Sequence, residues 1–241
     1  FGLGYYAGDY TPIVTPSSGT SFIIAKTGSG LQSQATSLYN GNISSMVTAI
    51  SKFMEQGDVP LGIAFQYDQL NRLMSSRAFN NVDTTDNEWN TSGVLTQYAT
   101  DYTYDANGNI LSLQRKGTAT QPNMDNLTYH YYSGTNRLEY VDDAITSTNY
   151  GVDIDDQSSG NYTYDAIGNL ISDASEEIEE IVWTVYGKIQ SITRTSTSTK
   201  PSLEFEYSPD GYRSAKHVTD PTTGFTTSTW YVRDASGNVM A

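Results

Sequence analysis

The chain of 241 residues contains no cysteine, and it has only 13 lysines and arginines against 27 aspartates and glutamates. Without cysteine it has neither a disulfide framework nor a thiolate for catalysis or metal binding. The formal net charge of −14 disfavours nucleic acid and anionic membranes, because phosphate recognition needs a basic surface. This charge permits cationic partners or plain solubility.

Long apolar runs are missing as well, since none approaches the ~20 residues that a membrane-spanning helix needs. No signal peptide is visible, and because the chain begins with Phe1 we expect a fragment or a processed product. Charged residues make up only 17%, whereas tyrosine alone occurs 19 times. This composition favours strands and turns over helices.

One stretch of the chain occurs twice. The segment from Asp101 to Leu111 (DYTYDANGNIL) returns almost letter for letter from Asn161 to Ile171 (NYTYDAIGNLI). Its alternation of tyrosine with threonine suits a pleated, half-buried strand. The aspartate and the Gly-Asn pair that follow are typical of a tight turn, because aspartate bonds nearby backbone and glycine adopts positive φ. Each copy therefore predicts a β-hairpin.

Diverged copies recur along the chain. In the copy from Leu38, Asn40-Gly41 is a type I′ turn signal, and in the copy from Phe65 the glycine is replaced by Asn71, which tolerates the left-handed conformation. The turns lie at positions 41, 71, 108, 135, 168, 187, 211 and 237. We expect the polar inserts between them to be exposed loops at 80–92, 116–126, 144–160 and 195–201.

The expected organisation is one continuous hairpin array over 38–241, without an internal domain boundary, after a lead-in strand or loop segment over 1–37. The one helical candidate is Ser172–Ile181. Its glutamates at 176, 177, 179 and 180 are better explained by a solvated loop or by charges that guard a strand edge.

Glycine motifs for nucleotides fail on spacing. Gly2, Gly4 and Gly8 are one residue too far apart for the dinucleotide fingerprint, and no strand precedes them. The segment Lys26–Gly30 is a turn and not a phosphate-binding loop, because no Gly-Lys-Ser/Thr follows at the required spacing.

Histidine chemistry is weakly supported too. His130 and His217 are the only histidines, and no G-x-S-x-G elbow accompanies them. His130, among three tyrosines, is interpreted as a strand residue that faces solvent or lumen and not as a base. Two separated histidines without cysteine make zinc improbable.

Two acidic segments are the best metal candidates, Asp142-Asp143 and Asp153-Ile154-Asp155-Asp156. The EF-hand pattern fails, because its sixth position from Asp153 is Ser158 where glycine is required. A solvated acidic loop is the default, with a casual calcium site as the alternative. The aspartate of the repeated unit recurs at hairpin after hairpin, as turn chemistry does and a catalytic residue does not. We therefore predict no enzyme, no cofactor, and no catalytic, cofactor-binding or metal-binding residues.

The repeated Tyr-Asp-x-x-Gly-Asn units resemble those of the RHS or YD-repeat family, most of all its large secreted members from Bacteroidota. The units concerned are Tyr104–Ile110, Tyr164–Leu170, Tyr67–Leu73 and Trp230–Val239. The resemblance covers roughly residues 38–241. It implies an all-β fold, in which a strip of consecutive antiparallel β-hairpins spirals into a hollow β-shell. Family members include polymorphic toxins, the cocoon component of insecticidal toxin complexes, and teneurins.

The resemblance also has limits. The chain ends at Ala241, just after a repeat, so the family's conserved region and toxin domain are not in it. No pair of autoproteolytic Asp-Pro-x-Gly motifs is present, since Thr222-Thr223 follows Asp220-Pro221, which marks a turn. These hairpins are too few to close a shell, so we expect open sheet edges, which invite pairing.

We therefore expect a non-enzymatic structural segment of a secreted RHS-repeat protein, extracellular or at the bacterial cell surface. It would form part of a β-shell that encloses or presents C-terminal, toxin-like cargo. The expected partners are the rest of the polypeptide, such cargo, and secretion machinery or surface proteins, without nucleic acid or membrane insertion. One alternative is a cell-surface adhesion or carbohydrate-binding module, since exposed Tyr and Trp can stack on sugars. Another is an RHS substrate captured with its secretion machinery.

Overall fold

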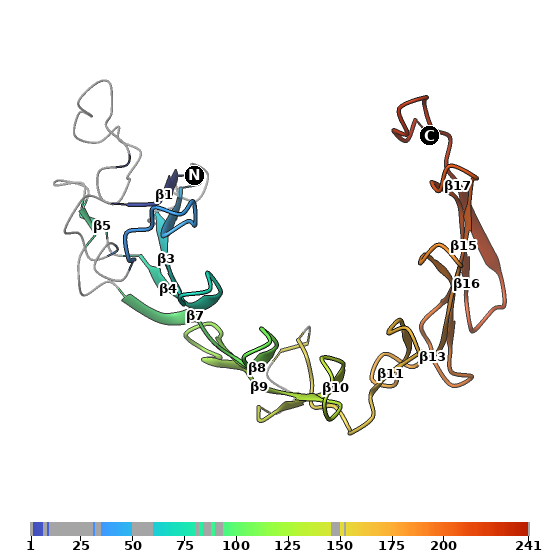
Figure 1. The fold of residues 1–241 in the computed structure, drawn as a ribbon, viewed down its shortest axis with the longest axis horizontal. Coiled ribbons are helices and arrows are strands. Elements are labelled where there is room, and N and C mark those ends of the chain that lie inside the picture. Colours follow the sequence, from blue (N-terminus) through green and yellow to red (C-terminus); the bar gives the residue numbers. More distant parts are fainter. Residues whose placement is uncertain are drawn as a thin grey trace. The chain divides into compact units, whose positions relative to one another are not determined.

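The computed structural model describes residues 2–6, 9, 31, 35–49, 60–80, 82–83, 88–89, 94–145, 150–151 and 153–240. Its regular structure is almost entirely β, which confirms the predicted all-β class (Figure 1). The strands are β1 (Gly2–Gly4), β2 (Ser45–Thr48), β3 (Leu61–Tyr67), β4 (Leu73–Phe79), β5 (Val82–Asp83), β6 (Glu88–Trp89), β7 (Val94–Tyr104), β8 (Ile110–Lys116) and β9 (Asn123–Tyr131). They continue with β10 (Leu138–Asp143), β11 (Tyr162–Tyr164), β12 (Leu170–Asp173), β13 (Ile178–Trp183), β14 (Ile189–Arg194), β15 (Ser202–Tyr207), β16 (Arg213–Thr219) and β17 (Thr226–Trp230).

Most strands pair with the strand that precedes or follows them in the chain; the exceptions are β4, which pairs with β7, and the break between β10 and β11. One sheet has the order β1-β2-β3-β4-β7-β8-β9-β10, a second runs from β11 to β17 in sequence order, and β5 pairs with β6. The pairs whose register is defined are antiparallel, such as Tyr102 opposite Leu113 and Phe205 opposite Lys216. This order confirms the predicted strip of consecutive antiparallel hairpins.

The chain divides into two compact units. The first unit comprises residues 1–129 and 142–156, and the second comprises 130–141 and 157–241. The described residues include no helix that is long and apolar enough to cross a membrane.

The first unit has a compact hydrophobic core, formed by Leu31, Ala35, Val47, Ala64, Phe79 and Trp89. Its largest side chain, Trp89, is only 2% exposed. A Cβ on Gly62 of β3 would lie 2.9 Å from the Trp89 ring, so glycine is what lets the indole approach the strand. The prediction of an exposed loop over 80–92 is therefore wrong at Trp89, because this insert carries β5, β6 and the main core residue.

The second unit has a thinner core. Its buried apolar side chains, Val141, Ile181, Phe205 and Ala215, come from different strands. A single sheet layer buries little apolar surface, so hydrogen bonds between neighbouring hairpins contribute more to holding the strands in register.

The segment Ser172–Ile181 is not a helix. Strand β12 ends at Asp173, residues 174–177 form a turn, and β13 begins at Ile178. The carboxylate of Asp173 accepts a hydrogen bond from the Glu176 amide at 3.2 Å, and Glu177 has φ +57°. Aspartate competes for backbone amides in this way and favours a turn over a helix interior.

The other inserts agree with the loop prediction in part. Strand β9 begins at Asn123, inside the insert 116–126, and Asp125 of that strand is buried. Ser198 is buried in the loop 195–201. The described residues of 144–160 contain no strand and form the predicted loop.

The turn predictions have mixed outcomes. Asn71 adopts φ +62°, which confirms the prediction that it replaces glycine in the left-handed conformation. The type I′ prediction for Asn40-Gly41 is wrong, because only Gly41 has positive φ, at +87°. The residue before this turn, Leu38, donates its amide to Tyr5 at 2.7 Å, so the turn leads from that contact into β2. The nucleotide-motif candidates Gly8 and Lys26–Gly30 lie outside the described residues.

We predict that Gly108→Ala destabilises the first unit by about 1 kcal/mol. Gly108 has φ +93°, and an added Cβ would meet nothing within 4 Å, so the cost is purely conformational. Urea unfolding measures it. The control is Gly151→Ala, where φ lies outside the left-handed range and the space is also open. Equal stability of the two variants would contradict the prediction.

Candidate functional site

The repeated turns that begin with aspartate are closed by that aspartate. Asp105 Oδ1 accepts the Asn109 amide at 2.8 Å, and Asp105 Oδ2 accepts Asn109 Nδ2 at 2.8 Å. The main chain adds Gly108 N to Asp105 O at 3.2 Å and Asp105 N to Asn109 O at 2.9 Å. With Gly108 left-handed, this is a type I turn followed by a glycine bulge. We call this arrangement the turn clasp.

The turn clasp recurs at three other positions in the chain. In Asp165–Asn169 the backbone N–H and the side-chain Nδ2 of Asn169 both donate to the Asp165 carboxylate, at 2.9 Å each. In Asp234–Asn238 the backbone N–H of Asn238 donates to the Asp234 carboxylate at 2.9 Å and Nδ2 donates at 3.0 Å. In Asp68–Arg72 the side-chain donor is Arg72 Nε, which takes the place of asparagine Nδ2 and lies 2.6 Å from Asp68 Oδ2. These aspartates are occupied by their own turns, as the sequence predicted for turn chemistry.

The turn clasps also shift the acidity of their aspartates. The side-chain hydrogen bond from Asn109 holds the pKa of Asp105 below its usual value, and Asn238 does the same to the pKa of Asp234. For Asp68 the backbone amide of Arg72 is the main cause of the lowered pKa. A lowered pKa means that the turn favours the ionised carboxylate.

Aromatic residues just before the turns join neighbouring hairpins. Four of them donate a side-chain N–H or O–H to a backbone carbonyl of the preceding hairpin: Tyr67 to Ile43 at 3.0 Å, Tyr104 to Leu73 at 2.7 Å, Trp183 to Leu170 at 2.8 Å, and Tyr207 to Ile189 at 2.8 Å. The acceptors Leu73, Leu170 and Ile189 open the second strand of the hairpin before. Trp183 preserves the bond although it is not tyrosine, because indole N–H is also a donor. We call these contacts the aromatic links.

Basic residues after alternate turns reach the next turn. Arg72 lies 4.7 Å from the centre of the Tyr104 ring and donates to Asp105 O at 2.9 Å. Arg137 repeats this over Tyr164, and Lys188 over Tyr207, with further bonds to Ala166 O and Gly211 O. Cation–π attraction and a charge-assisted hydrogen bond thus act together. We missed these links from the sequence, although Arg72, Arg137 and Lys188 alternate with Asn109 and Asn169 at one turn position.

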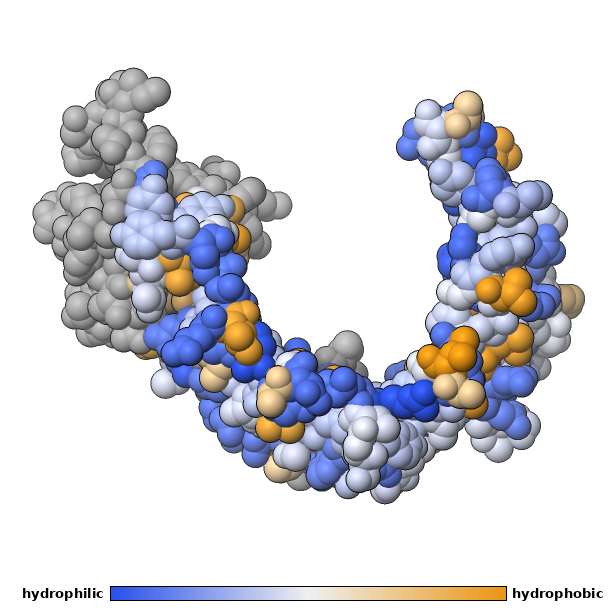
Figure 2. Space-filling model, in the orientation of Figure 1, coloured by the Kyte–Doolittle hydropathy of each residue, from blue (hydrophilic) through white to orange (hydrophobic). Residues whose placement is uncertain are grey.

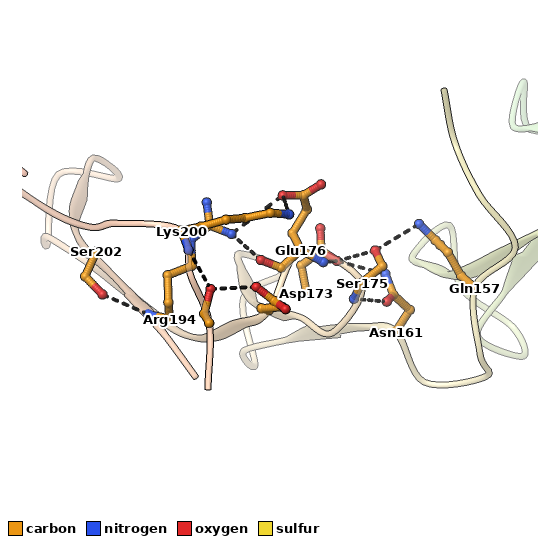
Figure 3. A network of polar contacts seen from close by, with 10 residues as sticks. Gln157, Asn161, Asp173, Ser175, Glu176, Arg194, Lys200 and Ser202 are labelled. Atoms are coloured by element: carbon orange, nitrogen blue, oxygen red, sulfur yellow. Dashed lines mark hydrogen bonds and ion pairs between the residues drawn. The ribbon is translucent and has the colours of Figure 1, made fainter. Parts of the chain in front are cut away.

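In the second unit a polar network joins the connections between successive hairpins, at the ends of the strands away from the repeated turns (Figure 3). Asp173 accepts hydrogen bonds from Asn161 Nδ2 at 3.0 Å and Ser175 Oγ at 2.9 Å. Glu176 pairs with Lys200 at 2.8 Å and lies 3.6 Å from Arg194. These contacts fasten the β12–β13 turn to the 195–201 loop. Most of its donors and acceptors serve one another, whereas Arg194 Nε is buried without a partner among the described residues.

His130 lies on β9, as predicted, and His217 lies on β16. The His130 ring stacks on Tyr140 with centres 4.3 Å apart. His217 lies between Ser228 Oγ, 2.8 Å from Nδ1, and Glu206 Oε1, 3.2 Å from Nε2. This order resembles a serine–histidine–acid triad, but Ser228 is exposed on β17 and water has free access. A cross-strand polar row explains the contacts fully.

The structure brings together part of the predicted acidic cluster. Carboxylate oxygens of Asp143 and Asp153 lie with one of Asp125 within 4.8 Å of one another. Burial raises the pKa of Asp153, and the charges of Asp125, Asp155 and Asp143 add to the rise. Asp142 and Asp155 are not part of this group, and Asp156 accepts the Asp143 amide at 3.3 Å. We missed Asp125, because it lies in a polar insert and no sequence signal marks it.

Comparison with known proteins gives limited information. No family model and no curated protein matches the chain. Among solved structures, TcdB2-TccC3 is similar at 13% identity and a TM-score of 0.39, over 85% of this chain and 9% of that one. TcdB2-TccC3-Cdc42 is similar at 12% identity and a TM-score of 0.38, over 85% of this chain and 9% of that one. TcdB2-TccC3-TEV is similar at 13% identity and a TM-score of 0.34, over 73% of this chain and 12% of that one. The chain thus spans about a tenth of these proteins, and likenesses this low establish no shared function.

We predict that Tyr104→Phe lowers the free energy of unfolding by about 1 kcal/mol, because it removes one aromatic link and leaves Leu73 O without its donor. Chemical denaturation measures the change. Tyr186→Phe is the matched control, since Tyr186 is 87% exposed at a turn tip. The prediction fails if the two substitutions cost the same.

Acid should weaken the turn clasps. Ionised Asp105 contributes stability that is fully present above the ordinary carboxyl pKa near 4 and is lost as pH falls through its lowered folded-state pKa. The stability difference between the wild type and Asp105→Asn should therefore shrink from about pH 7 to about pH 3. Urea midpoints at both pH values measure it, with Asp155→Asn, outside the turn clasps, as the control. A difference that does not change with pH would refute the prediction.

Proposed function

We propose that the chain is a non-enzymatic structural segment of a secreted or cell-surface RHS-type protein. In this proposal its hairpins form part of a β-shell wall that encloses or presents cargo carried by the same polypeptide. The observation that carries it is the recurrence of the aromatic links. Four of these links each fasten a hairpin to the one before it. Tyr132 makes the same kind of bond to the following hairpin, through Tyr162 O.

The use of the polar residues supports a structural role. A thin sheet has little core, so its rigidity must come from contacts within and between hairpins. The turn clasps supply the first kind, and the aromatic links with the basic residues at Arg72, Arg137 and Lys188 supply the second. The residues that the repeat unit shares are thereby accounted for by architecture.

The final strand supports continuation of the wall. β17 ends its sheet, pairs with β16, and is exposed at all five residues. Such an edge is a template for another strand. In the proposed wall the next part of the same polypeptide takes this place.

A carbohydrate-binding module is the second candidate, favoured by one observation. The rings of Tyr6 and Tyr39 stack 4.8 Å apart, and Tyr39 is 78% exposed. On the face shown in Figure 2, apolar residues form small separate patches among polar ones. Glycan-array binding by the chain, abolished by Tyr39→Ala and unaffected by Tyr186→Ala, would favour this candidate over the wall.

Electron cryo-microscopy of the intact polypeptide tests the proposal directly. The expected result is a continuous antiparallel sheet that passes through β17 into a further strand. Separate compact domains, with no strand beside β17, would overturn it.

Hydrogen exchange gives an independent prediction. The outward amides at alternate residues of β17 should exchange quickly in the 241-residue chain and slowly in the intact polypeptide, because a new strand would bond them. The amides of β15, which is paired on both sides, serve as the internal control. Equally fast exchange of β17 in both proteins is the contrary outcome.

A further inference from the structure

Three carboxylates from separate segments converge in the first unit. Asp125 lies on β9, Asp143 at the end of β10, and Asp153 in the loop after β10 (Figure 1 labels both strands). One oxygen from each lies within 4.8 Å of the other two. The turn clasps and the aromatic links use none of these residues.

One of these carboxylates has an oxygen without a partner. Asp125 is 3% exposed, and its Oδ2 accepts the Nε–H of Arg115. Its Oδ1 is shielded from solvent and, among the described residues, has no hydrogen-bond donor. Native proteins seldom leave a buried acceptor unsatisfied, because desolvation then goes uncompensated. The orphaned oxygen therefore points to a bound group that carries positive charge.

The charges around the cluster agree. Asp125, Asp143 and Asp153 carry three negative charges, and the ion pair that these three form with the described residues is that of Asp125 with Arg115. Two negative charges are left at close range, next to Asp156. Like charges at such distances repel strongly when partly buried, and a divalent cation would neutralise them.

We propose that Asp125, Asp143 and Asp153 bind a calcium ion. Carboxylate oxygens are hard donors, which calcium prefers. With Ca–O distances of about 2.4 Å, two ligands on opposite sides of the ion are separated by about 4.8 Å, whereas magnesium ligands span only about 4.2 Å. The three oxygens lie within 4.8 Å of one another, so one calcium ion can reach all of them. Calcium also accepts irregular oxygen coordination, whereas magnesium demands a near-ideal octahedron.

The carboxylate of Asp143 is already oriented for this role. Its Oδ1 accepts the amides of Asn126 at 2.9 Å and Ile145 at 3.0 Å. Such bonds restrain the carboxylate, as the supporting hydrogen bonds of metal ligands do. A bound ion would tie the loop containing Asp153 to β9 and β10.

Isothermal titration of the metal-free 241-residue chain with CaCl₂, at about 0.15 M KCl to screen diffuse binding, tests the proposal. We expect one saturable site with a dissociation constant of about 10⁻⁴ to 10⁻³ M, and weaker binding of MgCl₂. Asp153→Asn should weaken calcium binding about tenfold or more, and Asp143→Asn should do the same. Calcium should raise the melting temperature of the wild type, but not that of these variants.

The matched control is Asp155→Asn, which removes an equal charge from the same loop but no member of the cluster. It should bind calcium like the wild type. Far-UV circular dichroism establishes that each variant is folded, and Asp143→Asn keeps an acceptor for the Asn126 amide. Two results would overturn the proposal: no saturable binding by the wild type, or an equal loss in Asp155→Asn and Asp153→Asn. The latter would mean that the net charge of −14 attracts ions without a site.

Discussion

The structure depends on one interaction, the hydrogen bond from an aromatic side chain before a turn to a carbonyl of the preceding hairpin. A single-layer sheet buries few side chains completely, and an isolated hairpin is marginal in water. The bonds from Tyr104 to Leu73 and from Trp183 to Leu170 add a second attachment beside the backbone ladder. They lie next to the turns, where strands otherwise fray and splay. Arg72, Arg137 and Lys188 act at the same place, so cation–π contacts and charge-assisted hydrogen bonds also join the turn ends of successive hairpins.

The sequence predicts the hairpins well because their determinants are local. Aspartate, glycine and asparagine at fixed offsets specify a turn whatever surrounds it, and Asn71 at φ +62° shows that even a glycine substitution is predictable. The aspartates of these turns were also interpreted correctly as architectural. Asn40-Gly41 is the exception, because its neighbours pair with a distant segment through Leu38 and Tyr5 and do not face each other across the turn.

The features that the sequence did not predict depend on contacts between distant residues. Trp89 lies in a polar insert, and its burial follows from the space that Gly62 leaves on another strand. Asp125 has no motif around it, and only the pairing of β9 and the course of the loop after β10 bring Asp143 and Asp153 to it. In Ser172–Ile181 the sequence favoured a loop or strand edge over a helix, but it did not identify Asp173 as the acceptor of the Glu176 amide in the turn. Composition does not show which backbone amide a carboxylate will bind.

The aromatic links have a consequence for how the chain assembles. Each one joins a hairpin only to its immediate predecessor, so most of the bonding is between segments close in sequence. Such chains have low contact order and stability that is approximately a sum of nearest-neighbour terms. In each of the four links the acceptor carbonyl precedes the aromatic donor in the sequence. During synthesis from the N-terminus, the acceptor hairpin is therefore complete before the hairpin that docks on it, which favours folding in sequence order.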